Sequence, residues 1–168
     1  MQRSFVALAL AAVCLGASAQ TVSDSEWKEM DTPPPPALRT QGLIPVDVSG
    51  TSLRFGVDPA SVTVRSDGVV RYVIVASSSS GAVNAMYEGI RCDKAVVKVY
   101  ARHNPDSGWV PAQSDWQPLQ RSAATRHSLA VATGGACFGD TPNGTAAQVV
   151  QDLRAPIDRR FERGGVNR

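Results

Sequence analysis

Two cysteines constrain the fold of this chain more than any other feature, because they predict one long-range contact. The 168 residues contain three cysteines, Cys14, Cys92 and Cys137. Cys14 lies in a segment that we expect to be cleaved, which leaves an even pair in a compartment where disulfides persist. A bridge between Cys92 and Cys137 would close a loop of about 45 residues and stabilise the fold by about 4 kcal/mol. The alternative is two separate buried thiols.

Residues 1–19 have the pattern of a secretory signal peptide. Arg3 gives a positive start, Phe5 to Val13 form an apolar run, and Ala17-Ser18-Ala19 is typical of a signal-peptidase site. An uncleaved anchor is disfavoured, because about fifteen apolar residues fall short of the ~20 that span a bilayer. No later segment is long enough to be transmembrane. We therefore expect an exported protein in the periplasm, with a lipoprotein acylated at Cys14 or an outer-surface location as alternatives.

The charge balance disfavours nucleic acid as a partner. There are 17 Lys and Arg residues against 15 Asp and Glu, with no basic cluster inside the domain, and only 6% of residues are aromatic. Both electrostatic and stacking modes of nucleic-acid binding are therefore unexpected. Apolar residues make up 43% of the chain, which suits one globular domain with its own core.

Three regions follow the leader. Residues 20–42 are expected to be a flexible lead-in that ends in a stiff polyproline II spacer at Pro33–Pro36, with Trp27 attaching it to the domain surface. A Pro-rich ligand for a partner domain is the alternative interpretation of the prolines. Residues 43–155 form the domain, and 156–168 are expected to be a basic disordered tail.

Short segments rich in β-branched residues predict a meandering antiparallel sheet of about five or six strands, because their connections are too short for parallel pairing. The expected strands are 43–48, 53–57, 62–64, 69–76, 82–92 and 95–102. Residues 69–76 are expected to be covered on both faces, and Asp67-Gly68 predicts a type I′ turn. Residues 105–118 are expected to be irregular.

The segment 95–102 alternates between small or β-branched residues and polar or aromatic ones, so that one face joins the core. The residues expected on the core face are Ala95, Val97, Val99 and Ala101, and those expected on the other face are Lys98, Tyr100 and Arg102.

Two helices are predicted near the C-terminus, which makes the fold class α+β. The first runs from about Ser122 to Ala132 and ends at Gly134-Gly135. The second begins at a capping box of Thr145 and Gln148, and Pro156 blocks its continuation. Its apolar stripe consists of Ala146, Val149, Val150 and Leu153. The bridge would pin one or both helices to the sheet.

Four stretches carry a family resemblance. In chain order they are RFGVDPASVTVRSDGVVRYVIVASSSSGA, VNAMYEGIRC with KVYAR, SGWVPAQSDWQPL, and CFGDTPNGTAAQVVQDLR. Together they resemble the cryptic neisserial protein-like family, small exported bacterial proteins whose domain has no established activity. Asp58-Pro59, Tyr87-Glu88 before Cys92, and Trp116 before Pro118 are similar, more loosely, to the surface-adhesin protein E-like group. That similarity implies a meandering sheet with a helix pinned by a disulfide.

The chain departs from the family pattern beside its second cysteine. Phe138 follows Cys137 where a proline is usual, and Gly134-Gly135 replaces bulkier residues. Both differences predict a looser helix end at the bridge.

The sequence contains no specific catalytic or metal motif. His103 and His127 are its only histidines, and neither C-x-x-C nor H-E-x-x-H occurs, so no metal or cofactor is expected. A cysteine hydrolase with His127 as base would need Cys137 as a free thiolate, which the expected bridge removes. A serine hydrolase is disfavoured because the sequence contains no G-x-S-x-G motif. The carboxylates Asp58, Asp67, Glu88 and Asp115 form no recognisable pair, and no catalytic residue is assigned.

Charged residues in an apolar strand give the one candidate site. Glu88 and Arg91 could form ion pairs with Arg71 or Lys98, with Gly89 allowing close approach of a helix. The alternative is a polar ligand pocket on the sheet face, because such pockets combine aromatic surface with a few convergent polar groups. Its lining would be Tyr87, Glu88, Arg91, Tyr100 and Trp109.

These features favour a non-enzymatic exported domain that binds another protein or an envelope component. A small periplasmic hydrolase that uses carboxylates or one histidine is a second hypothesis. A purely structural role in envelope integrity is a third. The sequence specifies neither the partner nor the oligomeric state.

Overall fold

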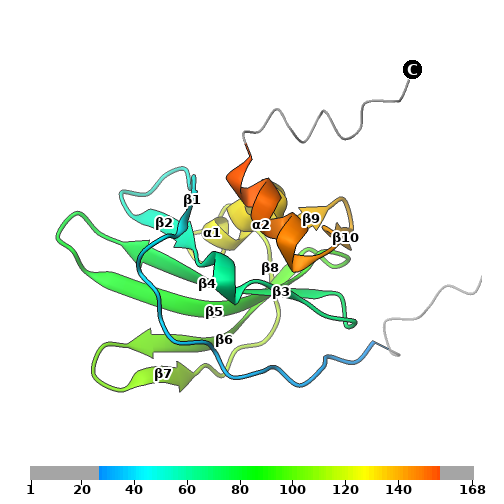
Figure 1. Ribbon diagram of the computed structural model, residues 1–168, viewed down its shortest axis with the longest axis horizontal. Coiled ribbons are helices and arrows are strands. Elements are labelled where there is room, and N and C mark those ends of the chain that lie inside the picture. Colours follow the sequence, from blue (N-terminus) through cyan, green and yellow to red (C-terminus); the bar gives the residue numbers. More distant parts are fainter. Residues whose placement is uncertain (1–26, 156–168) are drawn as a thin grey trace, which may run out of the picture.

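The computed structural model describes residues 27–155. The expected signal peptide, the start of the lead-in and the basic tail lie outside the described residues. An antiparallel sheet has helices on one of its faces and an extended N-terminal segment, blue in Figure 1, along the other. The predicted α+β class is therefore confirmed.

The sheet is a meander whose main path has six strands in the order β1-β2-β4-β5-β6-β7. These strands are β1 (Ile44–Val46), β2 (Arg54–Val57), β4 (Val69–Ser77), β5 (Val83–Arg91), β6 (Val96–Asn104) and β7 (Gly108–Pro111). Two short strands, β3 (Thr63–Val64) and β8 (Gln117–Pro118), pair with β4 and β6 respectively. A separate hairpin consists of β9 (Cys137–Phe138) and β10 (Thr141–Pro142).

β4 is the centre of the molecule. All its residues from Val69 to Ala76 are buried, which confirms the prediction that it is covered on both faces. Tyr72 and Ile74 face the main hydrophobic core under the helices, whereas Val73 and Val75 belong to a second cluster on the opposite face. We call these the helix face and the strap face of the sheet.

A β-bulge in β6 changes the predicted alternation. Val97 and Val99 join the core of the helix face as predicted, but Tyr87 of β5 pairs with Ala101 and Glu88 with Val99, which leaves Tyr100 as the extra residue. Ala101 therefore packs on the strap face with Tyr87. The predicted sides of Ala101 and Arg102 were wrong, because an inserted residue reverses the alternation beyond it.

Two further predictions need correction. The type I′ turn at Asp67-Gly68 is wrong, because Gly68 has a positive φ of 75° and Asp67 does not. The amide of Gly68 instead donates to the carbonyl oxygen of Arg65 at 3.0 Å. The segment 105–118, expected to be irregular, contains β7 and β8.

The first helix is shorter than predicted and ends differently. α1 (Arg126–Val131) continues into a π-turn, η3 (Ala132–Ala136), that bends at Gly135 before β9 begins. A 3₁₀ turn, η2 (Pro59–Ser61), lies between β2 and β3.

The second helix, α2 (Ala146–Arg154), begins where the capping box predicted. The hydroxyl of its N-cap residue Thr145 accepts a hydrogen bond from the amide of Gln148 at 3.2 Å. Val149 is buried in the core, and Ala146, Val150 and Leu153 pack against it, so the predicted apolar stripe is confirmed.

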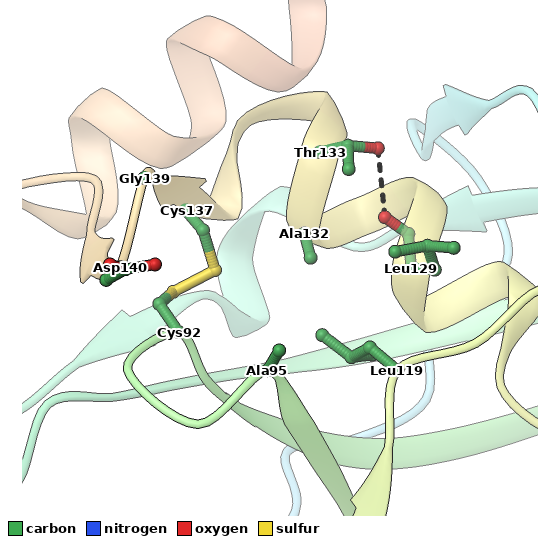
Figure 2. A pocket seen from close by; sticks show the side chains of 9 residues that line it. All are labelled: Cys92, Ala95, Leu119, Leu129, Ala132, Thr133, Cys137, Gly139 and Asp140. Atoms are coloured by element: carbon green, nitrogen blue, oxygen red, sulfur yellow. Dashed lines mark hydrogen bonds between the residues drawn. A yellow bond between two sulfur atoms is a disulfide. The ribbon is translucent and has the colours of Figure 1, made fainter.

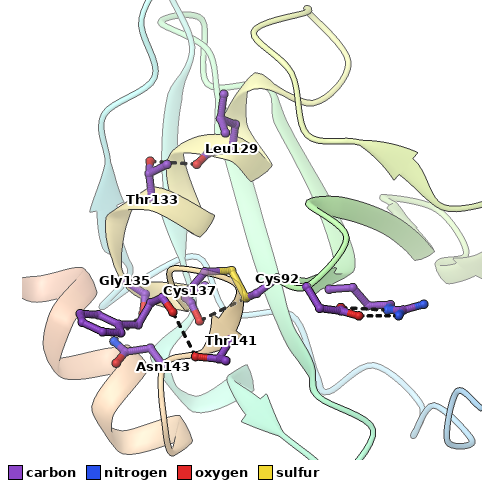
Figure 3. Close-up of a disulfide and its surroundings, with 11 residues drawn as sticks. Cys92, Leu129, Thr133, Gly135, Cys137, Thr141 and Asn143 are labelled. Carbon is purple, nitrogen blue, oxygen red and sulfur yellow. Dashed lines mark hydrogen bonds and ion pairs between the residues drawn. A yellow bond between two sulfur atoms is a disulfide. The ribbon is translucent and has the colours of Figure 1, made fainter. Parts of the chain in front are cut away.

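The predicted disulfide is present and joins the two layers. Cys92 lies directly after β5 and Cys137 directly after η3, with 5.7 Å between their Cα atoms (Figure 3). A Cβ atom on Gly135 would lie 2.7 Å from the backbone nitrogen of Leu153 in α2. Asn143 donates from Nδ2 to the carbonyl oxygen of Gly135 at 2.9 Å. The glycine therefore permits close packing of the π-turn on α2, which corrects the expectation of a loosened helix end.

Candidate binding surface

The strap face carries most of the predicted site residues. Tyr87 and Arg91 point to this face from β5, Tyr100 lies at the bulge of β6, and Trp109 follows on β7. Glu88 points to the helix face, because neighbouring residues of a strand lie on opposite sides. The structure therefore brings three of the five residues together, Tyr87, Tyr100 and Trp109, and separates Glu88 from them.

The extended segment over this face, residues 27–38, is called the strap here. At one end, the indole nitrogen of Trp27 donates to the carbonyl oxygen of Asp67 at 2.9 Å. At the other end, Trp109 donates from its indole nitrogen to the carbonyl oxygen of Pro36 at 2.8 Å. Leu38 packs on the second hydrophobic cluster. The proline-rich segment that the sequence suggested as a spacer thus belongs to a strap that is attached to the sheet at both ends.

A cavity remains between the strap and the sheet. Its volume is about 240 Å³, and aromatic rings and prolines form most of its wall. The lining residues are Thr32, Pro33, Pro34, Pro35, Tyr87, Tyr100, Ala101, Trp109 and Pro111. The ring centroids of Tyr87 and Tyr100 are 5.6 Å apart. Burial raises the pKa of the Tyr87 phenol.

Charged residues surround the N-terminal end of the strap. Arg71 is fully buried and donates from NH2 to Oδ2 of Asp67 at 2.7 Å. Lys98 donates to Oε2 of Glu29 at 3.0 Å, and the Tyr100 hydroxyl donates to Oε1 of the same carboxylate at 2.7 Å. Burial and the hydrogen bond to Glu29 raise the pKa of Tyr100. The cations of this face are therefore matched by strap and turn carboxylates, not by Glu88.

The Asp67 carboxylate is the main acceptor of this cluster. Burial alone would raise its pKa, but hydrogen bonds from Arg71 and from the amides of Val69 and Met30 hold the pKa below its usual value. Asp67 therefore stays ionised while it links β4 to the strap. Its partner Arg71 has one buried side-chain nitrogen, Nε, without a hydrogen-bond partner.

Gly89 has a different role from the one predicted. A Cβ atom at this position would lie 2.7 Å from Cε2 and from the hydroxyl oxygen of Tyr100. The glycine makes room for the Tyr100 ring across the strand pair, not for a helix.

Arg91 lies at the edge of the surface beside two tryptophans. Its guanidinium carbon is 3.6 Å from the ring centroid of Trp27, a close cation–π contact. Trp27 in turn meets Trp116 edge to face, with 6.0 Å between ring centroids. Arg91 also pairs with Asp93, at 2.6 Å from NH2 to Oδ2.

Glu88 lies at the centre of a buried network on the helix face. Its Oε2 accepts from the hydroxyls of Tyr72 and Ser128, both at 2.9 Å, and its Oε1 lies 2.8 Å from Nε2 of His127. The His127 ring stacks on Phe55 at 5.4 Å between centroids. Burial and the nearby Glu88 raise the pKa of Tyr72 well above its usual value.

This network corrects the predicted ion pairs of Glu88 with Arg71 or Lys98. His127, which comes from α1, takes their place as its partner. Glu88 is 1% exposed and His127 5%. The arrangement attaches α1 to the sheet and leaves little access for a substrate.

A second cavity, of about 410 Å³, lies beside the disulfide. Figure 2 shows Ala95 and Leu119 below and Leu129 and Ala132 above, with the bridge at one end. Asp140 adds a carboxylate near the bridge, and the remainder of the wall is mostly apolar. The Thr133 hydroxyl, which could offer a polar contact, donates to the carbonyl oxygen of Leu129 at 2.9 Å.

The predicted attachment of the lead-in by Trp27 is confirmed by its hydrogen bond to Asp67, but sequence reasoning missed the remainder of the strap as part of the surface. Its proline run was visible, but the partners of Glu29 and Pro36 lie about seventy positions away in β6 and β7. The buried pair of Arg71 and Asp67 had a local signal, because the two residues are four positions apart across a turn.

Within residues 27–155, no group of three or more His, Cys, Asp or Glu side chains could hold a metal ion. None of the helices in this part of the chain is long and apolar enough to cross a membrane.

The fold and the surface define a class: an α+β domain closed by one disulfide, with a proline-rich strap over the open face of its sheet. The chain belongs to the CNP1-like family, whose model matches residues 22–154. No curated protein and no solved structure is significantly similar to it.

Proposed function

We propose that the chain is an exported, non-enzymatic binding domain of the cell envelope, which holds another protein or an envelope component on its strap face. The signal-peptide pattern of residues 1–19 supports export, with the periplasm as the preferred location. The ordered motifs support a narrower place within the CNP1-like family, among the cryptic neisserial protein-like members. The looser similarity to the surface-adhesin protein E-like group supports the meander fold and no particular ligand.

One observation carries the binding proposal. Three aromatic side chains, Tyr87, Tyr100 and Trp109, line a cavity on the sheet, with charged groups at one end of the same face. Ligand sites combine concave apolar surface with a few convergent polar groups in this way. The cavity of about 410 Å³ on the helix side is larger, but no aromatic side chain lines it.

The geometry disfavours the second hypothesis, a hydrolase that uses His127 or Glu88. A nucleophile and its base must lie within hydrogen-bond reach and contact the substrate. Ser128 donates to Glu88 and not to His127, and all three side chains are buried. The network is arranged to support α1 instead.

Capture from envelope extracts tests the proposal. The intact protein, immobilised, should retain a reproducible component, and Trp109→Ala should lose it while the exposed control Asp115→Asn keeps it. Turnover of a peptide, ester or glycan substrate that disappears in His127→Ala would favour the hydrolase. A deletion that sensitises cells, without any component that depends on Trp109, would favour the purely structural role.

A further inference from the structure

The contacts between strap and sheet indicate the class of partner, an inference that rests on the proposed binding function. Two side chains of the domain donate hydrogen bonds to backbone carbonyl oxygens of the strap. Trp109 donates to Pro36 at 2.8 Å, and Arg65 donates from NH1 to Asp31 at 2.9 Å. Proline has no amide hydrogen, so a proline-rich segment offers carbonyl acceptors without leaving donors unsatisfied. The surface therefore presents the groups that such a segment needs.

The surface also binds an acidic side chain of the strap, Glu29. The Glu29 carboxylate accepts from Lys98 and Tyr100, and its Oε1 lies 3.8 Å from NH2 of Arg71. Hydrogen bonds to an ionised acceptor are about twice as strong as neutral ones. Glu29 lies four positions before Pro33, so the face recognises a carboxylate at a set distance from a proline run.

The strap fits this face only in part. Pro33–Pro35 and the rings of Tyr87, Tyr100 and Trp109 line the two sides of the cavity of about 240 Å³. Residues 27–38 form neither strand nor helix, so no backbone ladder holds them to the sheet. Prolines against aromatic rings, with an indole donor to a carbonyl, are the contacts by which proline-rich peptides bind aromatic grooves. A competing segment could make the same contacts.

We propose that the strap is an intramolecular ligand, and that the face beneath it binds an extended proline-rich segment, with an acidic residue upstream of the prolines, from a partner protein. The strap occupies the face until the partner segment displaces it, because both use the same donors and rings.

A peptide of residues 27–38 (WKEMDTPPPPAL), labelled with a fluorophore, tests the proposal by anisotropy with the intact chain. In wild type the attached strap competes. Glu29→Gln in the chain weakens the attached strap and leaves the sheet unchanged, so the peptide should bind about tenfold more tightly. Lys28→Gln is the matched control, since Lys28 is exposed, and should behave as wild type. Adding Trp109→Ala to the Glu29→Gln chain should abolish binding.

Two altered peptides test what the face reads. Replacing the four prolines by serine, or Glu29 by glutamine in the peptide, should each weaken binding about tenfold or more. Equal binding of the serine peptide would overturn proline recognition. Should Glu29→Gln fail to fold by circular dichroism, Trp27→Phe, which removes the indole donor to Asp67, replaces it.

Two other outcomes overturn the proposal. One is that the anisotropy of the labelled peptide does not rise with protein concentration, although the variants with a weakened strap are folded. The other is that a variant with a weakened strap forms a dimer and does not bind the peptide. The strap of a second copy would then occupy the face. If the peptide fails while envelope capture still depends on Trp109, the binding function stands and only the peptide class is wrong.

Discussion

At the scale of single residues, Glu88 decides how α1 is attached to the sheet. Its carboxylate takes hydrogen bonds from two hydroxyls and lies against His127, and the partners on α1 are 39 and 40 positions away in sequence. The sequence showed a charge in an apolar strand but could not show its partner, because that partner arrives only through tertiary packing. Neighbouring residues of a strand point to opposite faces, so Tyr87 and Glu88 do not share a face, although the predicted pocket lining included both.

Replacing Glu88 by leucine should destabilise the protein by about 3 kcal/mol, because Tyr72, Ser128 and His127 would lose their buried acceptor. Glu88→Gln should cost clearly less, since hydroxyls can reverse and accept from the new amide. Urea unfolding measures both. Asp115→Leu, at an exposed site, is the control and should stay within about 0.5 kcal/mol. A tolerated Glu88→Leu would contradict the anchoring role.

Gly135→Ala should destabilise the protein by about 1–3 kcal/mol, because its new methyl group meets the backbone of α2, which cannot move aside. Gly134→Ala is the matched control. Its Cβ atom would lie 3.3 Å from Cδ2 of Leu153, the flexible end of a side chain, so its effect should be small. Thermal unfolding of both variants measures the difference, and equal melting temperatures would count against close packing here.

At the scale of elements, local patterns were sufficient wherever local chemistry decides the structure. The capping box at Thr145 and the run of β-branched residues in β4 predicted their elements closely. The bulge at Tyr100 and the strand β7 were missed, because both depend on pairing with neighbours. The end of α1 was also missed, since the bend at Gly135 depends on α2 lying against it.

The turn between β3 and β4 should make stability depend on acid pH. The pKa of Asp67 is lowered in the folded protein, so its contribution is complete above the unfolded value near 4. That contribution disappears as pH falls through the folded value. Asp67→Asn should therefore lose less stability than wild type between pH 7 and pH ~2.5 in urea unfolding. Asp106→Asn, at an exposed site, should keep the dependence of wild type; identical curves for all three proteins would contradict the assignment.

At the scale of the whole molecule, the helical layer, which the disulfide ties to β5, and the strap cover the two faces of one sheet. The bridge was predictable from the cysteine count, but the strap was not, since four prolines fix their own backbone and not what they touch.

The double variant Cys92→Ala/Cys137→Ala should lose about 4 kcal/mol of stability, as expected for a bridge across 45 positions. Urea unfolding of the oxidised protein and of the variant measures this. A loss below about 1 kcal/mol would mean that packing alone holds η3 and β9 against the sheet.

Use of the strap face for binding requires that the strap leaves the sheet more easily than the protein unfolds. Hydrogen–deuterium exchange on the intact protein measures this directly. The amide of Met30, which donates to Asp67, reports on the strap, and the amide of Val73 reports on β4. We expect Met30 to exchange at least about a hundredfold faster than Val73, since it opens locally. Equal, slow exchange at both sites would show that the strap is a fixed part of the core and that the face beneath it is permanently closed.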